Sequence, residues 1–320
     1  MNLTQYVNTF GGLMRARHGC KVHKVSINAA FTCPNRDSTK GIGGCTFCNN
    51  ASFNPNTRRI PGVEEQVRAG QAVVGRQMNA RRFIAYFQAY TNTYGDVGTL
   101  AALYDSALSV PGVIGLSVGT RPDCVPDAVL DLLASYRDRG YEVWLELGLQ
   151  SASDAVLRRV NRGHDVACYR DAMKRARRRG LQVCTHLIVG LPGEAPEASL
   201  GAAQLAIEQG TDGLKLHPLH VVKGTRMARE WKQGQVPVLS QSEYVDIVCS
   251  IIRAAPEDLS FHRLTGTASR ELLLAPDWCA HKWSVLNLIG DRLAGQAAGE
   301  SAIVGNSSRR IEVSPIICRG

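Results

Sequence analysis

Residues 177–190 read RRRGLQVCTHLIVG, in which the end of a helix is followed by glycine, one linking residue and a run of strand-forming residues. The same order recurs at residues 137–148, RDRGYEVWLELG, and at residues 207–218, IEQGTDGLKLHP. Glycine in this place is typical of the left-handed residue that ends a helix, and the arginines before the first two favour the negative end of the helix dipole. The repeated joint predicts parallel strands connected by helices.

Short strand-like runs alternate with helix-like runs over most of the chain. The strand candidates are residues 21–29, 82–89, 113–118, 141–148, 182–189 and 213–218. Apolar residues between them recur at helical spacing, as in Val63, Val67, Val74 and Met78, and in Leu100, Leu103, Tyr104 and Leu108. Six strands in this order form either an open doubly wound sheet or a curved, barrel-like one. Both place the chemistry at the carboxyl ends of the strands.

The alternation breaks after residue 218, which predicts a division of the chain into four parts. We expect an N-terminal extension at residues 1–20, the barrel at 21–220, a helical covering segment at 221–293 and a disordered tail at 294–320. The tail is predicted because the segment is rich in Gly, Ser and Ala and nearly lacks aromatic residues.

The composition is that of a folded protein rather than a disordered or fibrous one, since 44% of the 320 residues are hydrophobic and 20% are charged. No stretch approaches the roughly 18–20 apolar residues of a membrane-spanning helix, and the N-terminus lacks the apolar core of a secretory signal. We therefore expect a cytoplasmic protein without a membrane partner. In the reducing cytosol, closely spaced cysteines favour metal binding or catalysis over disulfides.

Three of the ten cysteines are clustered directly after the first predicted strand. Cys33, Cys45 and Cys48 follow the pattern C-x11-C-x2-C in a polar, glycine-rich loop, whose turns allow the three thiolates to approach one metal or cluster. A closed structural zinc site needs a fourth ligand, for which Cys20 or His23 is available, and the chain would then be a non-catalytic, zinc-stabilised binding protein. The other interpretation is an iron–sulfur cluster with one iron open to a ligand.

Motifs over nearly the whole chain resemble one known family. Among them are VNTFGG, CPNRD, GGCTFCN, YFQAYTNTYG, GTRPDC, GYEVWLELGLQS, NRGHD, CTHLIVGLPGE and LLAPDWC. The sequence is similar to the radical S-adenosylmethionine (SAM) enzymes, and within them to the bacterial YhcC-like group, which is related to the elongator-type proteins. The long first gap between cysteines departs from the usual C-x3-C-x2-C spacing of that superfamily.

The resemblance implies an α/β fold, a partial TIM-like barrel of six strand–helix units with a C-terminal extension. It implies a 4Fe-4S cluster bound by Cys33, Cys45 and Cys48, with SAM chelating the fourth iron. Reductive cleavage of SAM would then give methionine and a 5′-deoxyadenosyl radical that takes hydrogen from a substrate. The implied partners are a reductant such as flavodoxin or ferredoxin and an unnamed substrate, while the oligomeric state is left open.

Six further residues are predicted to contact the cofactor. The resemblance assigns Phe47 to packing against SAM, Gln150 and Arg162 to its ribose and carboxylate, and Gly190 to its adenine. For the SAM amino group, which the glycine-rich second-strand motif of the superfamily contacts, this sequence offers either Gln88 or Thr91 as a polar contact. An amide can hydrogen-bond a ribose, and an arginine can hold a carboxylate through two parallel bonds. Glu146 alternates with apolar neighbours and is predicted to point into the barrel, either as a ribose or substrate contact or as one half of an ion pair.

The chain is basic, with a net charge of 37 − 28 = +9, and nine basic residues crowd one segment. They are Arg158, Arg159, Arg162, Arg170, Lys174, Arg175, Arg177, Arg178 and Arg179. Such a segment would attract RNA phosphates, and the elongator-type resemblance implies transfer RNA, so an RNA-modifying enzyme is a second hypothesis. His186, His217 and His220 stand where they could face a substrate, without an assigned role. Cys124 and Cys279 are considered as hydrogen donors, against the commoner buried thiol.

Overall fold

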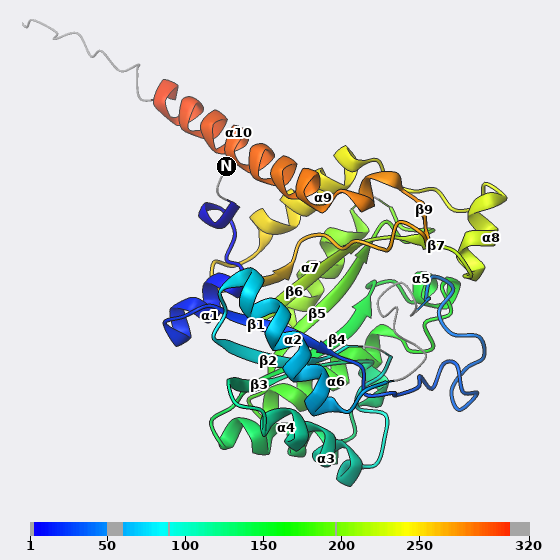
Figure 1. Cartoon of the computed structure of the whole chain (residues 1–320). Coiled ribbons are helices and arrows are strands. Elements are labelled where there is room, and N and C mark those ends of the chain that lie inside the picture. Colours follow the sequence, from blue (N-terminus) through cyan, green and yellow to red (C-terminus); the bar gives the residue numbers. More distant parts are fainter. Residues whose placement is uncertain (1–2, 50–59, 89, 196, 308–320) are drawn as a thin grey trace, which may run out of the picture.

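The computed structural model contains a curved parallel sheet with helices on its outer side (Figure 1). It describes residues 3–49, 60–88, 90–195 and 197–307, with side chains described as far as residue 295. The sheet has the order β1-β2-β3-β4-β5-β6-β8, and every neighbouring pair is parallel. Its strands are β1 (Val22–Ile27), β2 (Arg82–Phe87), β3 (Val113–Thr120), β4 (Glu142–Gln150), β5 (Gln182–Val189), β6 (Gly213–Pro218) and β8 (Ser260–Arg263). The six predicted strands and the partial barrel are confirmed.

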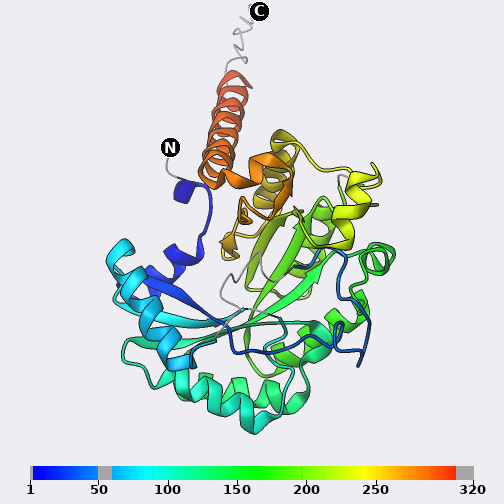
Figure 2. The same cartoon turned by 45° about the vertical axis from the view of Figure 1, so that its right-hand side comes forward.

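Helices connect the consecutive strands and cover the convex face of the sheet (Figure 2). They are α2 (Val63–Met78), α3 (Val97–Leu108), α4 (Asp127–Asp138), α5 (Asp154–Arg159), α6 (Val166–Arg178) and α7 (Ala198–Glu208), with the short turns η1 (Leu3–Gln5) and η3 (Pro122–Cys124) elsewhere. Gly140, Gly180 and Gly210 all have positive φ angles. The predicted helix–glycine–strand joint is therefore confirmed at each of its three positions. None of the described helices meets the length and apolar character of a membrane span.

The seventh strand, β8, pairs with β6 although it comes from the segment predicted only to cover the barrel. Four residues are too few to show strand periodicity in a sequence, which explains why this strand was missed. The same segment contains α8 (Arg226–Lys232), α9 (Gln241–Ala254), η4 (Asp277–Ala280) and a small antiparallel sheet of β7 (Val221–Val222) and β9 (Leu273–Ala275). Residues on both sides of the predicted boundary at residue 220 thus share one sheet.

The last helix, α10 (Lys282–Ser307), projects away from the rest of the molecule (Figure 2). Val285, Ile289 and Leu293 recur every four residues and are buried in the main core, on the side of α9. The predicted start of a disordered tail at residue 294 therefore falls inside this helix. Residues 308–320 of that predicted tail lie outside the described residues.

Side chains alternate between the two faces of each strand, which divides the interior of the barrel into layers. In β4, Val143, Leu145 and Leu147 pack in the core shared with the helices, whereas Trp144 and Glu146 point to the concave side. The inner face is consequently apolar at the level of Trp144 and charged at the level of Glu146.

Helix α1 (Phe10–His18) closes the amino-terminal end of the barrel. The ring of Phe10 meets that of Trp144 edge to face, with 5.6 Å between ring centroids. Arg17 Nη1 donates hydrogen bonds of 2.8 Å to both carboxylate oxygens of Glu142 at the start of β4. Helix α1, which lies within the predicted N-terminal extension, therefore forms the floor of the barrel.

Trp144 is completely buried, and we expect Trp144→Ala to lower the free energy of unfolding by about 3–5 kcal/mol, the usual cost of removing a buried aromatic ring. Trp144→Phe should cost less, because the indole Nε1 has no hydrogen-bond partner in the described structure. Denaturant unfolding followed by circular dichroism measures both. Trp283→Ala is the control: with 72% of Trp283 exposed, its change should stay within about 0.5 kcal/mol. Equal losses for Trp144→Ala and Trp283→Ala would contradict this account.

Candidate active site

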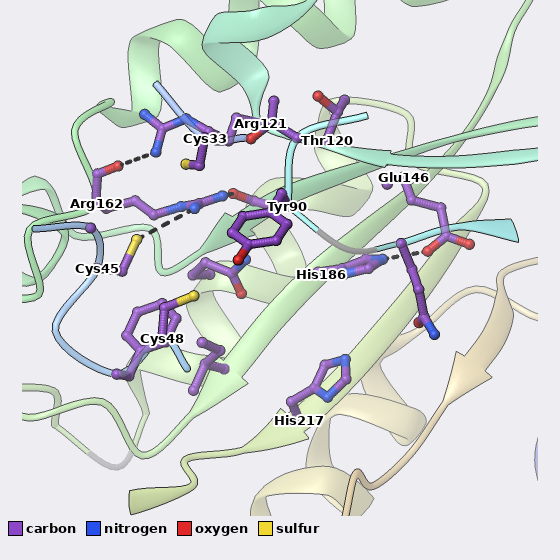
Figure 3. Close-up of a pocket in the computed structure, with 18 of the residues that line it drawn as sticks. Cys33, Cys45, Cys48, Tyr90, Thr120, Arg121, Glu146, Arg162, His186 and His217 are labelled. Carbon is purple, nitrogen blue, oxygen red and sulfur yellow. Dashed lines mark hydrogen bonds and ion pairs between the residues drawn. The ribbon is translucent and has the colours of Figure 1, made fainter. Parts of the chain in front are cut away.

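The three clustered cysteines line one cavity at the carboxyl ends of the strands (Figure 3). Their loop leaves β1 and folds around Asn35, whose side chain is completely buried. The Asn35 amide donates hydrogen bonds to the Asn161 carbonyl oxygen at 2.5 Å and to Cys45 Sγ at 3.7 Å. A Cβ atom at Gly41 would lie 2.1 Å from Asn35 Oδ1, so glycine is required there. The eleven-residue gap is thus organised by the side chain of Asn35, which lies in the CPNRD motif but was given no role from the sequence.

Arg162 and Gln150, predicted to act together, meet beside Cys45. Arg162 donates from Nη1 to Cys45 Sγ at 3.6 Å and from Nη2 to the Gly148 carbonyl oxygen at 2.8 Å. A Cβ atom at Gly148 would lie 2.6 Å from both Arg162 Nη2 and Gln150 Nε2. The two side chains therefore share the space that this glycine leaves. Arg162 Nε is buried without a partner among the described residues and is free to bind a ligand.

Positive charge gathers around the cysteine thiols. Arg36 donates to the Cys48 carbonyl oxygen at 2.6 Å, and Arg121 is held by two hydrogen bonds to the Asp123 carboxylate. Burial and the neighbouring Cys45 thiol raise the pKa of the Cys48 thiol, whereas Arg36 lowers it. Crowded, buried thiols ionise together only where positive charge is close, as arginines or a metal provide it. The donor set therefore fits a metal cluster.

The cavity measures about 240 Å³ and extends from the cysteines across the concave face of the sheet. In Figure 3 the cysteines lie on one side, Tyr90 lies in the middle, and His186, Glu146 and His217 lie on the other side. The cavity thus has a cysteine end and a histidine end.

Glu146 has no exposed surface, as its alternation with apolar residues predicted. Its Oε1 accepts hydrogen bonds from Lys24 Nζ and Ser117 Oγ, both at 2.5 Å. Its Oε2 accepts one from His186 Nε2 at 2.6 Å and another from Lys215 Nζ. Four donors occupy the carboxylate, which supports the ion-pair interpretation and leaves no acceptor for ribose or substrate.

These charges determine which groups around Glu146 are ionised. Although burial opposes ionisation of Glu146, Lys215, Lys24 and His186 together hold the pKa of its carboxyl well below the usual range. Burial lowers the pKa of Lys215 to about 7, against the attraction of Glu146. Burial and the charge of Lys215 lower the pKa of His186 to about 4. His186 is therefore neutral at pH 7, while Lys24 and Lys215 form the ion pairs with the Glu146 carboxylate.

The other predicted cofactor residues differ in position. Phe47 lines the cavity and packs against the apolar cluster that includes Leu219. Gln88 also lines it and donates to Ser26 Oγ at 2.7 Å. Gly190 lies outside the cavity lining; it has a φ of 89°, and a Cβ atom there would lie 2.8 Å from the Leu239 side chain. Its contact with adenine stays a prediction.

Cys124 and Cys279 are both buried and do not line this cavity. Cys124 Sγ lies 3.8 Å from a carboxylate oxygen of Asp123, and Cys279 is part of η4. This placement gives no support to a hydrogen-donor role for either thiol.

The zinc hypothesis required Cys20 or His23, which lie at the amino end of β1, whereas the cysteine loop leaves its carboxyl end. Six extended residues separate these ends by about 20 Å. In the described ranges, no three His, Cys, Asp or Glu side chains are close enough to hold a single metal ion. The positions of Cys20 and His23 therefore disfavour a closed zinc site completed by either residue.

Comparison with known proteins decides the family. A model of the radical SAM superfamily matches residues 32–206, and one of the radical SAM C-terminal domain matches residues 211–295. The chain belongs to the radical SAM superfamily. It is therefore a radical SAM enzyme, and membership implies a 4Fe-4S cluster and SAM as cofactors.

Two bacterial proteins match this chain over nearly their whole length. Protein YhcC of Escherichia coli K12 is 50% identical over 284 residues, which cover 89% of this chain and 91% of YhcC. YtqA of Bacillus subtilis is 36% identical over 298 residues, or 93% of this chain and 92% of YtqA. The Methanocaldococcus infernus Elp3 structure superposes with a TM-score of 0.62 at 17% identity, over 86% of this chain and 63% of that one, and shows the shared radical SAM fold.

Several residues of this radical SAM site were not identified from sequence. Lys215 did carry a signal, because it is a charged residue between two leucines of its strand, as Glu146 is. Lys24 carried a weaker one, because its strand also contains His23 and Ser26. Arg121 follows the end of β3 in the motif GTRPDC, but nothing in the sequence indicated which residue it would contact. Arg263 ends the strand that was missed.

Removing the Glu146 charge should leave its two lysines unbalanced. At pH 7 we expect Glu146→Gln to lower the free energy of unfolding of the cluster-free protein by about 3–5 kcal/mol. The difference from wild type should shrink as pH falls below about 4.3. Below that pH, Glu146 becomes protonated in the unfolded chain but stays ionised in the folded chain, so the free energy of unfolding of wild type decreases. Urea unfolding between pH 3 and 7 measures it, and the exposed Glu64→Gln should change stability by about 1 kcal/mol or less. A difference that stays constant with pH would contradict the assignment.

Proposed function

We propose that this chain binds a 4Fe-4S cluster through Cys33, Cys45 and Cys48 and cleaves SAM reductively. The observation that carries the proposal is the convergence of three cysteines on one cavity in a chain of the radical SAM superfamily. Three thiolates leave the fourth iron without a protein ligand. Bound there, the cluster would supply one electron to divide SAM into methionine and a 5′-deoxyadenosyl radical.

Residues of the chain would position SAM at the cysteine end. The Arg162 guanidinium, already oriented by the Gly148 carbonyl oxygen, would hold the methionyl carboxylate. The Gln150 amide would bind ribose, and Phe47 would pack against the bound nucleotide. Gln88 would have to exchange its bond to Ser26 for one to the amino group of SAM.

Glu146 supports this site without touching SAM. Its carboxylate binds Lys24, Ser117, His186 and Lys215 in one buried layer at the floor of the cavity, where Glu146 and His186 form part of the lining. That layer excludes water from beneath the reacting groups, which protects a radical from quenching. We therefore assign Glu146 as a positioning residue.

The reductant would approach from the outer side of the cysteine loop. A second hollow is lined by Cys45 and Cys48 together with Arg36, Arg226 and Arg229. A one-electron donor such as flavodoxin or ferredoxin could come close to the cluster there without entering the SAM cavity.

A transfer RNA substrate receives less support. Four of the nine crowded basic residues pair with acidic side chains: Arg159 with Glu230, Arg175 with Asp171, Arg177 with Asp212 and Arg179 with Asp131. Arg162 is buried in the cavity. The surface charge offered to RNA is therefore smaller than the sequence indicated. Tight transfer RNA binding that weakens steeply with salt would favour the RNA hypothesis.

Each cysteine of the cluster loop should be required for iron. After anaerobic reconstitution we expect about four iron atoms per chain in wild type and fewer than about one in Cys33→Ser, Cys45→Ser or Cys48→Ser. With SAM and dithionite, only wild type should form 5′-deoxyadenosine. Cys20→Ser and Cys168→Ser are matched controls outside the cavity and should behave as wild type. Full iron content in a loop variant would overturn the assignment.

Arg162→Ala should weaken SAM binding about ten- to a hundredfold, as expected for loss of a charge-assisted hydrogen bond. Equilibrium dialysis on the reconstituted protein measures the Kd. Arg158→Ala removes an exposed arginine from the neighbouring helix and should leave the Kd unchanged. Because Arg162 also contacts Cys45, iron content is measured alongside. An unchanged Kd in Arg162→Ala with full iron would refute its role.

A further inference from the structure

Arg263 is the one arginine lining the cavity for which the described residues provide no acceptor. The other three, Arg36, Arg121 and Arg162, all donate hydrogen bonds to backbone or carboxylate oxygens. Arg263 is half-buried at the histidine end, where a guanidinium without an anion is costly. A half-buried arginine without an acceptor indicates that a ligand supplies the anion.

A bulge in β8 brings Arg263 into the cavity. The pairing between β6 and β8 shifts, so that Lys215 lies opposite Arg263 rather than His262. His262 already points into the barrel, where its ring centroid lies 4.4 Å from that of Trp144. In a regular strand the next residue would face outward, whereas a bulge lets two consecutive side chains reach the same side. The backbone is thus shaped to present Arg263 inward.

No acidic side chain of the cavity is free to neutralise Arg263. Glu146 is the sole carboxylate among the described residues that line it. Its two oxygens already accept four hydrogen bonds, two of them from lysines. The histidine end therefore carries surplus positive charge.

Two histidines add neutral donors beside this charge. Burial and the charge of Arg263 hold the pKa of His217 well below its usual value, so its ring is neutral. His220 Nε2 is buried without a partner in the described part of the chain. A Cβ atom at Gly266 would lie 2.8 Å from His217 Nδ1 and 3.5 Å from His220 Cε1, so the loop after β8 packs directly against both rings.

We propose that Arg263, His217 and His220 bind a carboxylate or phosphate group of the substrate, which is a small anionic metabolite. The planar guanidinium matches two oxygens of either group, and each neutral ring can donate one N–H. Ile188 and Val222 line the same cavity and suit an apolar part of the molecule. A small molecule is favoured over RNA because the surplus positive charge lies inside the cavity, while four of the eight basic residues of the segment outside it are paired with acidic side chains.

This inference rests on the proposed function, since it assigns the substrate to the end of the cavity opposite the cysteines. SAM would occupy the cysteine end, so losing Arg263 should not prevent SAM cleavage. The two assignments can therefore fail separately.

Calorimetric titration of the anaerobically reconstituted, SAM-loaded enzyme tests the anion site. Inorganic phosphate and acetate are titrated separately, with ionic strength held constant by sodium chloride. We expect saturable binding of at least one anion to wild type, and the tighter of the two identifies the group. Arg263→Gln should weaken anion binding at least tenfold. Arg263→Lys should weaken it less, because lysine keeps the positive charge but lacks the paired N–H donors of the guanidinium. Arg270→Gln, on an exposed arginine, should bind as wild type does.

Two results would overturn the anion site. One is the absence of saturable binding of either anion to wild type, and the other is equal binding by wild type and Arg263→Gln. If Arg263→Gln does not fold, His217→Gln replaces it and should also weaken binding. The same samples are assayed for 5′-deoxyadenosine without added substrate. Its absence from wild type would refute the proposed function, whereas its presence in both proteins with unequal anion binding supports both proposals.

Discussion

The buried carboxylate of Glu146 is the constraint on which the interior of this barrel depends. An unpaired charge in this position would cost several kcal/mol, so its partners must arrive together. They come from separate strands: Lys24 from β1, Ser117 from β3, His186 from β5 and Lys215 from β6. Tyr86 of β2 joins them by accepting a hydrogen bond from Lys215. Six successive strands must curve toward one another for this network to close.

The layer around Glu146 separates two regions with different chemistry. Below it, the packing of Phe10 and Trp144 is apolar and supplies stability. Above it, the cavity carries cysteines and Arg162 at one end and Arg263 at the other. Most of the groups that could bind a ligand thus lie above a layer whose carboxylate already accepts four hydrogen bonds. The same strands therefore contribute stabilising apolar side chains at one level and cavity-lining side chains at the next.

Local rules were sufficient to predict much of this molecule. The glycine joints and the strand periodicity predicted the parallel sheet, and the cysteine spacing predicted the metal-binding loop. The alternation of apolar residues predicted that Glu146 points into the barrel. Contacts between distant segments were not accessible in the same way. Asn35 acts through Asn161, which lies far along the chain, and no local pattern marks that pairing. Arg263 faces inward because of a bulge in a four-residue strand. Neither the bulge nor so short a strand produces a periodic pattern in the sequence.

The closure of the barrel by α1 has a further consequence. Among the described residues, Phe10, Trp144 and the Arg17–Glu142 ion pair fill the amino-terminal end of the barrel, whereas the cavity lies at the carboxyl ends of the strands. Substitutions that loosen α1 are therefore expected to change stability without changing the residues that ligands contact.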